Sequence, residues 1–230
     1  MFYRISFFCI FILFEPLNVW AAADLYVYWP TDFRPRIIQN AFKNECKGLK
    51  VLAFARSKDF YLKVAQDKPS AVISFVEVIK KINYQVYKKG MNSYSKREDW
   101  ILVSFDNPID FTAQKKIKIA ALDIFGRKET RKFLEKALKT KISYRRVVKI
   151  EDLMAVMQRN RANGIILSKT HLKKIKSLTK RKLVETKTGI SMSLATVGIN
   201  KKKSNHQDLA YCLKVLSFKS KALMGVEKWL

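Results

Sequence analysis

Glycine and proline are scarce in this chain, which has 7 glycines and 5 prolines among 230 residues. The sequence also contains no internal repeat and no low-complexity segment. Disordered connections are usually rich in proline, glycine and serine, so this composition argues against a disordered linker. A chain of this length can form one large domain or two small lobes, each with its own core.

Histidine and cysteine are also few, with 2 histidines and 3 cysteines, and none of them has the spacing of metal ligands. The chain has no HExxH motif, no nucleophile elbow, no Walker loop and no useful Cys/His pairing. The sequence therefore predicts no metal site, no cofactor and no enzymatic activity.

Acidic residues are outnumbered, with 19 Asp and Glu against 46 Lys and Arg, and the formal net charge is +27. The hydrophobic content of 48% is too high for a disordered basic tail. Because the cations occur in every segment, we expect a folded basic protein. Such a charge attracts nucleic acid, anionic lipid or acidic polysaccharide without selecting among them.

The first 23 residues have the pattern of a secretory signal peptide. Arg4 precedes an apolar run over residues 5–14, and three alanines at 21–23 follow, so cleavage is expected after Ala21 or Ala23. The run is too short to cross a bilayer, although an uncleaved anchor remains the alternative. Export predicts a periplasmic protein and disfavours nucleic acid as the partner.

Cys9 lies within the predicted signal peptide, which leaves Cys46 and Cys212 in the mature chain. Disulfides persist in oxidising compartments such as the periplasm. The sequence is compatible with a disulfide between these two residues and equally with two separate buried thiols.

Short apolar strands alternate with amphipathic helices along the mature chain, which predicts an α/β fold with parallel βαβ units. The organising stretch is residues 116–138, KIKIAALDIFGRKETRKFLEKAL, a buried strand followed by a glycine turn and a helix. Ligands of open α/β sheets bind beyond the carboxyl ends of the strands. Arg127 and Thr130 in the first helical turn favour an anion there, whereas the alternative is a plain turn with solvated charges.

This order of elements resembles a type 2 periplasmic solute-binding protein, nearest to the short phosphate/phosphonate-binding (PhnD-like) proteins of ABC transporters. Three stretches account for the resemblance: residues 116–138, residues 150–175 (IEDLMAVMQRNRANGIILSKTHLKKI) and the return strand LATVGINKK at 194–202. It implies two lobes joined by two hinge crossovers. Lobe 1 is expected to comprise residues 24–106 and 190–230, lobe 2 residues 107–189, and the hinges lie near residues 105–110 and 188–193.

The resemblance further implies a non-enzymatic protein that captures a small solute and passes it to an ABC permease or a membrane sensor. Oxyanions such as phosphate or phosphonate are examples of such a solute. The expected ligand-binding residues follow strand ends of both lobes and are Tyr28, Trp29, Thr31, Asp32, Ser74, Phe75, Asp123, Phe125, Arg127, Thr130 and Ser168. For each of them the alternative is a helix cap, a turn or a core side chain. Asp32 and Asp123 can also accept from an amine, so the charge of the solute stays open.

The net charge of +27 supports an alternative function, because capture of a small solute does not require so many cations. In that alternative the protein keeps the solute-binding architecture without a ligand. Its basic surface then binds an acidic component of the cell envelope.

Overall fold

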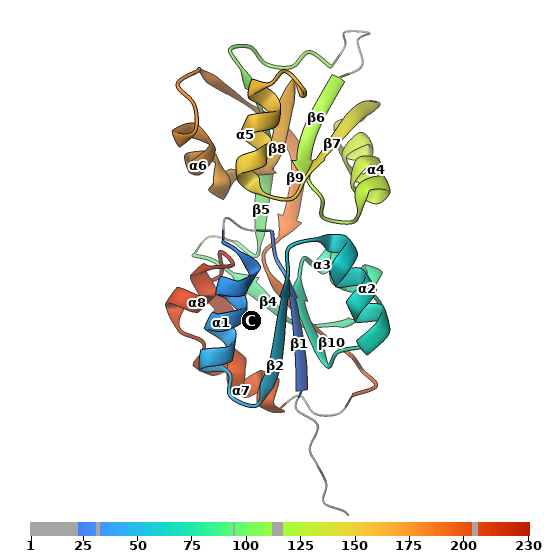
Figure 1. The fold of residues 1–230 in the computed structure, drawn as a ribbon, viewed down its shortest axis with the longest axis vertical. Helices are drawn as coiled ribbons and strands as arrows, with labels where there is room; N and C mark the ends of the chain where they lie inside the picture. Colours follow the sequence, from blue (N-terminus) through green and yellow to red (C-terminus); the bar gives the residue numbers. More distant parts are fainter. Residues whose placement is uncertain (1–22, 31–32, 94, 112–116, 204–206) are drawn as a thin grey trace, which may run out of the picture.

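A computed structural model describes residues 23–30, 33–93, 95–111, 117–203 and 207–230 of the chain (Figure 1). Residues 1–22 of the predicted signal peptide lie outside the described residues, as do Thr31 and Asp32. Among the residues described, no helix is both long enough and apolar enough to cross a membrane.

Two β-sheets, one in each of two lobes, follow one another along the long axis of the molecule (Figure 1). The first sheet has the order β11-β4-β10-β3-β1-β2. Its strands in the described part of the chain are β1 (Ala23–Tyr28), β2 (Leu49–Phe54), β3 (Ala71–Ser74), β4 (Gln85–Met91), β10 (Thr196–Ile199) and β11 (Lys228–Trp229). The second sheet has the order β7-β6-β8-β5-β9. Its strands are β5 (Arg97–Phe105), β6 (Ile117–Leu122), β7 (Ile142–Val147), β8 (Gly164–Ser168) and β9 (Leu183–Ser193).

Helices cover both faces of each sheet (Figure 1). The first sheet lies between two groups, α1 (Pro35–Glu45) with α7 (Gln207–Val215) and α8 (Phe218–Ala222), and α2 (Ser57–Asp67) with α3 (Val76–Lys81). The second lies between α4 (Arg127–Leu138) and a group formed by α5 (Ile150–Gln158), the 3-10 turn η1 (Lys169–His171) and α6 (Leu172–Ser177). Apolar residues at helical spacing determine which side of each helix is buried, for example Ile38 and Phe42 of α1.

The central strands are parallel in both lobes, because β1 pairs with β2 and β3, and β6 pairs with β7 and β8. Antiparallel strands then complete each sheet: β10 pairs with β3 and β4, and β5 pairs with β8 and β9. The predicted two-lobe α/β architecture is confirmed. The predicted parallel βαβ units are present in the centre of each sheet, and the antiparallel strands are an addition that the sequence analysis did not predict.

The positions of the crossovers differ from the sequence prediction. β5 belongs to the second sheet, so the chain leaves the first lobe between Met91 and Arg97 and not near residue 106. β9 continues to Ser193, so residues 188–193 are strand and the return crossing is at residues 194–195. The reason is that a buried strand has the same apolar pattern in either sheet. The pattern alone therefore does not show to which lobe a strand such as β5 belongs.

The two crossovers lie side by side and are hydrogen-bonded to each other. Leu194 N–H donates to the carbonyl of Lys96 at 3.0 Å, and Gly90 N–H donates to the carbonyl of Ala195 at 2.9 Å. A Cβ atom on Gly90 would lie 2.2 Å from that Ala195 oxygen, so glycine is required for this close approach. The hinge is therefore a two-stranded ribbon that continues the β4–β10 pair into the β5–β9 pair.

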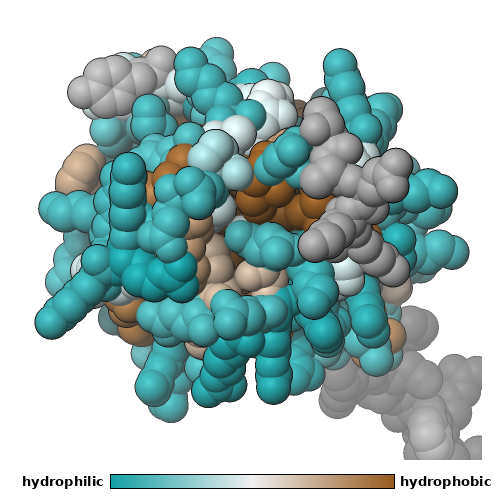
Figure 2. Space-filling model, turned by 90° about the horizontal axis from the view of Figure 1, so that it is seen from above, coloured by the Kyte–Doolittle hydropathy of each residue, from teal (hydrophilic) through white to brown (hydrophobic). Residues whose placement is uncertain are grey.

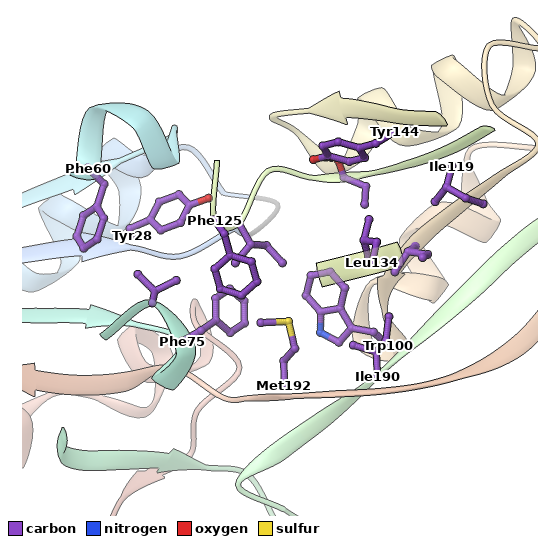
Figure 3. Close-up of a cluster of buried hydrophobic side chains, with 14 of the residues drawn as sticks. Tyr28, Phe60, Phe75, Trp100, Ile119, Phe125, Leu134, Tyr144, Ile190 and Met192 are labelled. Atoms are coloured by element: carbon purple, nitrogen blue, oxygen red, sulfur yellow. Dashed lines mark hydrogen bonds between the residues drawn. The ribbon is translucent and has the colours of Figure 1, made fainter. Parts of the chain in front are cut away.

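One hydrophobic cluster extends across both lobes, while two others are confined to one lobe each. The shared cluster lies on the α2, α3 and α4 side of the sheets and includes Phe60, Phe75, Trp100, Phe125 and Met192 (Figure 3). Burial of apolar side chains in this cluster stabilises the contact between the lobes.

Cys46 at the end of α1 and Cys212 in α7 are joined by a disulfide, and both side chains are buried. The bond connects positions 166 residues apart in the chain. It thereby holds the returning C-terminal helices against the N-terminal part of the first lobe.

We expect reduction of this disulfide to lower the free energy of unfolding by about 2–5 kcal/mol, because the unfolded chain regains the entropy of a very long loop. Urea denaturation of the oxidised protein with and without dithiothreitol measures the change. The C46A/C212A variant is the control, because dithiothreitol should not alter its midpoint. An equal midpoint for the wild-type protein in both conditions would contradict the prediction.

Candidate functional site

The carboxyl ends of parallel strands from the two lobes point toward each other at the lobe junction (Figure 1). In the first lobe Tyr28 of β1 is in register with Phe54 of β2, and in the second Leu122 of β6 is in register with Val147 of β7. The residues that follow these strands therefore meet between the lobes, the position at which open α/β sheets bind ligands.

Asp123, directly after β6, is the most connected polar residue of this junction. Its carboxylate accepts hydrogen bonds from Ser57 Oγ of the first lobe at 3.2 Å and from Thr130 Oγ1 at 3.3 Å. Arg146 Nη1 lies 3.4 Å from the same carboxylate. Tyr28 Oη also crosses the junction and donates to the backbone carbonyl of Asp123 at 2.5 Å. Asp123 thus connects both lobes through its side chain and its backbone.

A tight turn places Asp123 in this position. Gly126 has φ of 92°, a conformation that other residues rarely adopt, and α4 begins at the next residue. The Thr130 hydroxyl accepts from the Phe125 N–H at 3.0 Å while it donates to Asp123. The strand, turn and helix predicted from residues 116–138 therefore act together to orient one carboxylate.

Three phenol groups surround this carboxylate. Burial raises the pKa of Tyr28, Tyr61 and Tyr144, and the negative charge of Asp123 raises it further. The phenols therefore keep their protons at neutral pH. Tyr144 Oη donates within its own lobe, to the carbonyl oxygens of Ala121 and Leu122 at 3.3 Å each.

One flank of the junction is filled by the protein's own side chains. Phe125 extends from the second lobe into the cluster that contains Phe75 and Tyr28 of the first (Figure 3). Lys81 Nζ donates to the Phe125 carbonyl at 2.9 Å, which adds a hydrogen bond between the lobes. A shallow depression of about 290 Å³ remains on this flank, lined by Lys81 of the first lobe and by Phe125, Glu129, Lys132, Phe133 and Lys136 of the second.

The other flank, between β2 and β7, contains two adjoining hollows. The first, about 260 Å³, is lined by Tyr28, Arg56, Ser57, Lys58, Asp123 and Arg146, among others. The second, about 360 Å³, is lined mainly by Trp29, Phe33, Pro35, Phe54, Lys149 and Glu151. Both are bounded by Pro30, Ala55 and Val148, so they adjoin each other between the lobes, and the two together are called the groove.

The structure brings together only part of the predicted ligand-binding residues. Tyr28 and Asp123 line the first hollow and Trp29 the second, while Thr130 supports Asp123 from behind. Three others, Ser74, Phe75 and Phe125, are buried and line neither hollow.

Two predicted residues lie away from both hollows. Arg127 lines a separate depression of about 450 Å³ at α4 and β7, together with Lys128 and Arg131. Ser168 contacts Thr170 Oγ1 at 3.0 Å and His171 Nδ1 at 2.6 Å. The remaining two, Thr31 and Asp32, lie outside the described residues.

Sequence reasoning missed the cations of the first hollow, Arg56, Lys58 and Arg146. Arg56 and Lys58 follow β2, and Arg146 is near the end of β7. The sequence prediction selected residues after β1, β3, β6 and β8 and left out these two strands. Because parallel neighbours end at the same edge, the residues after β2 and β7 could have been included on the same argument.

A search of the described residues for groups of three or more His, Cys, Asp or Glu side chains able to hold a metal ion found none.

No family model and no curated protein sequence matches the chain. Solved structures share its fold. XAC2383 from Xanthomonas citri, bound to ATP, covers 90% of each chain with a TM-score of 0.63 and 8% identity. A mutant of arginine-bound ArgBP from T. maritima covers 84% of this chain and 94% of that chain, with a TM-score of 0.52 and 16% identity. The alignment with the periplasmic VFT2 domain of BvgS from Bordetella pertussis covers 88% of this chain and 91% of that domain, with a TM-score of 0.53 and 10% identity.

These structures, with the substrate-binding protein of an amino acid ABC transporter, define the fold as periplasmic-binding-protein-like with two lobes. The finer resemblance to the phosphate/phosphonate-binding proteins stays a prediction.

The hydrogen bond from Tyr28 to Asp123 connects the lobes, whereas those of Tyr144 stay within the second lobe. We expect Tyr28→Phe and Tyr144→Phe each to lower the free energy of unfolding by about 1 kcal/mol. Only Tyr28→Phe should accelerate amide hydrogen exchange, by about 5-fold, at the facing segments 55–57 and 123–126. Exchange rates that change equally in both variants would show that this bond does not couple the lobes.

Proposed function

We propose that this chain is a non-enzymatic periplasmic binding protein that holds a small anionic solute in the groove between its lobes. The observation that carries the proposal is the first hollow. Three cationic side chains, Arg56, Lys58 and Arg146, line it beside the single carboxylate of Asp123.

The cations suit an oxyanion in both charge and geometry. An arginine guanidinium presents paired N–H donors that match a carboxylate or a phosphate. The N-terminus of α2 adds to them, because α2 has no side-chain cap and its residues Ser57 and Lys58 line the hollow. Backbone N–H groups at a helix N-terminus favour anions. Phosphate, phosphonate and carboxylate groups are therefore the preferred ligand chemistry.

Asp123 allows the solute to carry a hydrogen-bond donor in addition to its anionic group. Its carboxylate is nearly buried yet lines the hollow, so a hydroxyl or ammonium group of the solute can donate to it. Two structures with the same fold were solved with a solute that carries both kinds of group, XAC2383 with ATP and ArgBP with arginine.

In this proposal the protein works in the periplasm and delivers its solute to an ABC permease or a membrane sensor. Rotation of the lobes about the two-stranded ribbon at Gly90 and Ala195 would open the groove. The interlobe bonds of Asp123 would re-form on closure.

We expect the mature protein to bind at least one of inorganic phosphate, methylphosphonate and L-glutamate in isothermal titration calorimetry. The R56A/K58A variant should weaken that binding by about 10-fold or more, because it removes two charged donors from the hollow. The control variant K139A/K180A removes the same charge from exposed positions that line neither hollow. Its affinity should equal that of the wild-type protein.

Two results would count against the proposal. Absence of heat with all three probes, at concentrations up to the millimolar range, would remove its basis. Equal weakening in both variants would show that the net charge and not the hollow attracts the anion.

The packed flank of the junction favours a second candidate function. The shared cluster already holds the lobes together through Phe75 and Phe125, and hydrophilic side chains cover most of the end of the second lobe (Figure 2). A closed protein with a net charge of +27 could bind an acidic envelope component through its surface alone. In that case the K139A/K180A and R56A/K58A variants should weaken binding to vesicles containing phosphatidylglycerol to the same extent.

A further inference from the structure

The second hollow differs in chemistry from the first. Its walls are mainly apolar and include Trp29, Phe33, Pro35 and Phe54. Its charged residues are of both signs, Arg34 and Lys149 against Glu151 and Asp152. A bound group would therefore gain little from net charge there and more from apolar contact.

Aromatic packing fixes two of these walls. The ring centroids of Trp29 and Phe75 lie 4.4 Å apart, and Phe75 belongs to the shared cluster. Phe54 contacts Tyr26 at 5.4 Å and Phe60 at 5.7 Å between ring centroids. Side chains held in this way present preformed surfaces, so a ligand does not have to order them on binding.

Phe33 is the exception among the aromatic residues of the groove. It precedes α1 and its side chain is 44% exposed to solvent, although it lines the second hollow. A planar group in the hollow would cover it.

The first hollow is smaller than most ligand pockets. Ligand pockets usually measure about 300–1,000 Å³, and the first hollow, about 260 Å³, falls below that range on its own. Since both hollows meet at Pro30, Ala55 and Val148, one molecule can occupy them together.

We infer that the solute is an aryl-bearing anion, with its charged group in the first hollow and its planar apolar group in the second, against Trp29, Phe33 and Phe54. This inference rests on the proposed anion-binding function and specifies the class of solute. The anionic group binds the cations, and the ring provides the apolar area that a compact oxyanion lacks.

Isothermal titration calorimetry with three probes tests the inference: phenyl phosphate, inorganic phosphate and benzyl alcohol. Phenyl phosphate should bind at least 10-fold more tightly than either of the others, because it alone occupies both hollows. The Phe33→Ala variant should reduce the preference for phenyl phosphate over phosphate to 3-fold or less. Leu62→Ala is the matched control, because Leu62 is 56% exposed on α2 and lines neither hollow. It should not alter the preference.

The outcomes separate this inference from the proposed function. Equal affinities for phenyl phosphate and phosphate would overturn the aryl subsite and leave anion binding intact. Binding of benzyl alcohol as tight as that of phenyl phosphate would reduce the groove to an unspecific apolar surface and contradict both. If neither phosphate compound binds, the proposed function fails and the inference fails with it.

Discussion

The contact between the lobes is the constraint on which the rest of this structure depends. It has a polar part, in which Tyr28 and Ser57 of the first lobe donate to Asp123 of the second. It also has an apolar part, in which Phe125 joins the cluster around Phe75. The polar bonds require defined positions while apolar burial supplies most of the free energy, so the arrangement of the lobes is specific as well as stable. The polar part borders the groove, because Tyr28, Ser57 and Asp123 also line its first hollow.

The asymmetry of the junction decides what the protein can hold. In the flank next to α3 and α4, Phe75 and Phe125 pack into the shared cluster, and a shallow depression of about 290 Å³ remains beside Lys81. In the flank next to β2 and β7, short loops leave room between Arg56 and Arg146. A solute in this position contacts strand ends and the N-terminus of α2, and it displaces no part of the packed cluster. In the proposed function the solute would therefore share Tyr28, Ser57 and Asp123 with the polar lobe contact and leave the packed cluster in place.

The sequence was sufficient for the α/β class and the importance of the stretch around Asp123, because these follow from local periodicity, whereas the two lobes were expected from the resemblance. It was insufficient for the crossovers, since the apolar run of β5 is equally compatible with either sheet and only its pairing with β8 and β9 assigns it. It also could not indicate which strand ends face an open groove. Phe75 and Arg56 both follow strands of the first lobe, yet one is buried and the other lines the hollow, and the difference arises from contacts with the opposite lobe.

The packed flank also affects how a solute would act on the protein. A ligand shifts the balance between open and closed states only by the difference in its affinity for the two. The shared cluster and the hydrogen bonds of Asp123 already stabilise the closed arrangement without a ligand. The solute would therefore spend less of its binding free energy on closing the lobes than in a protein whose lobes touch only through the ligand. More of the interaction free energy of the proposed solute would then appear as affinity.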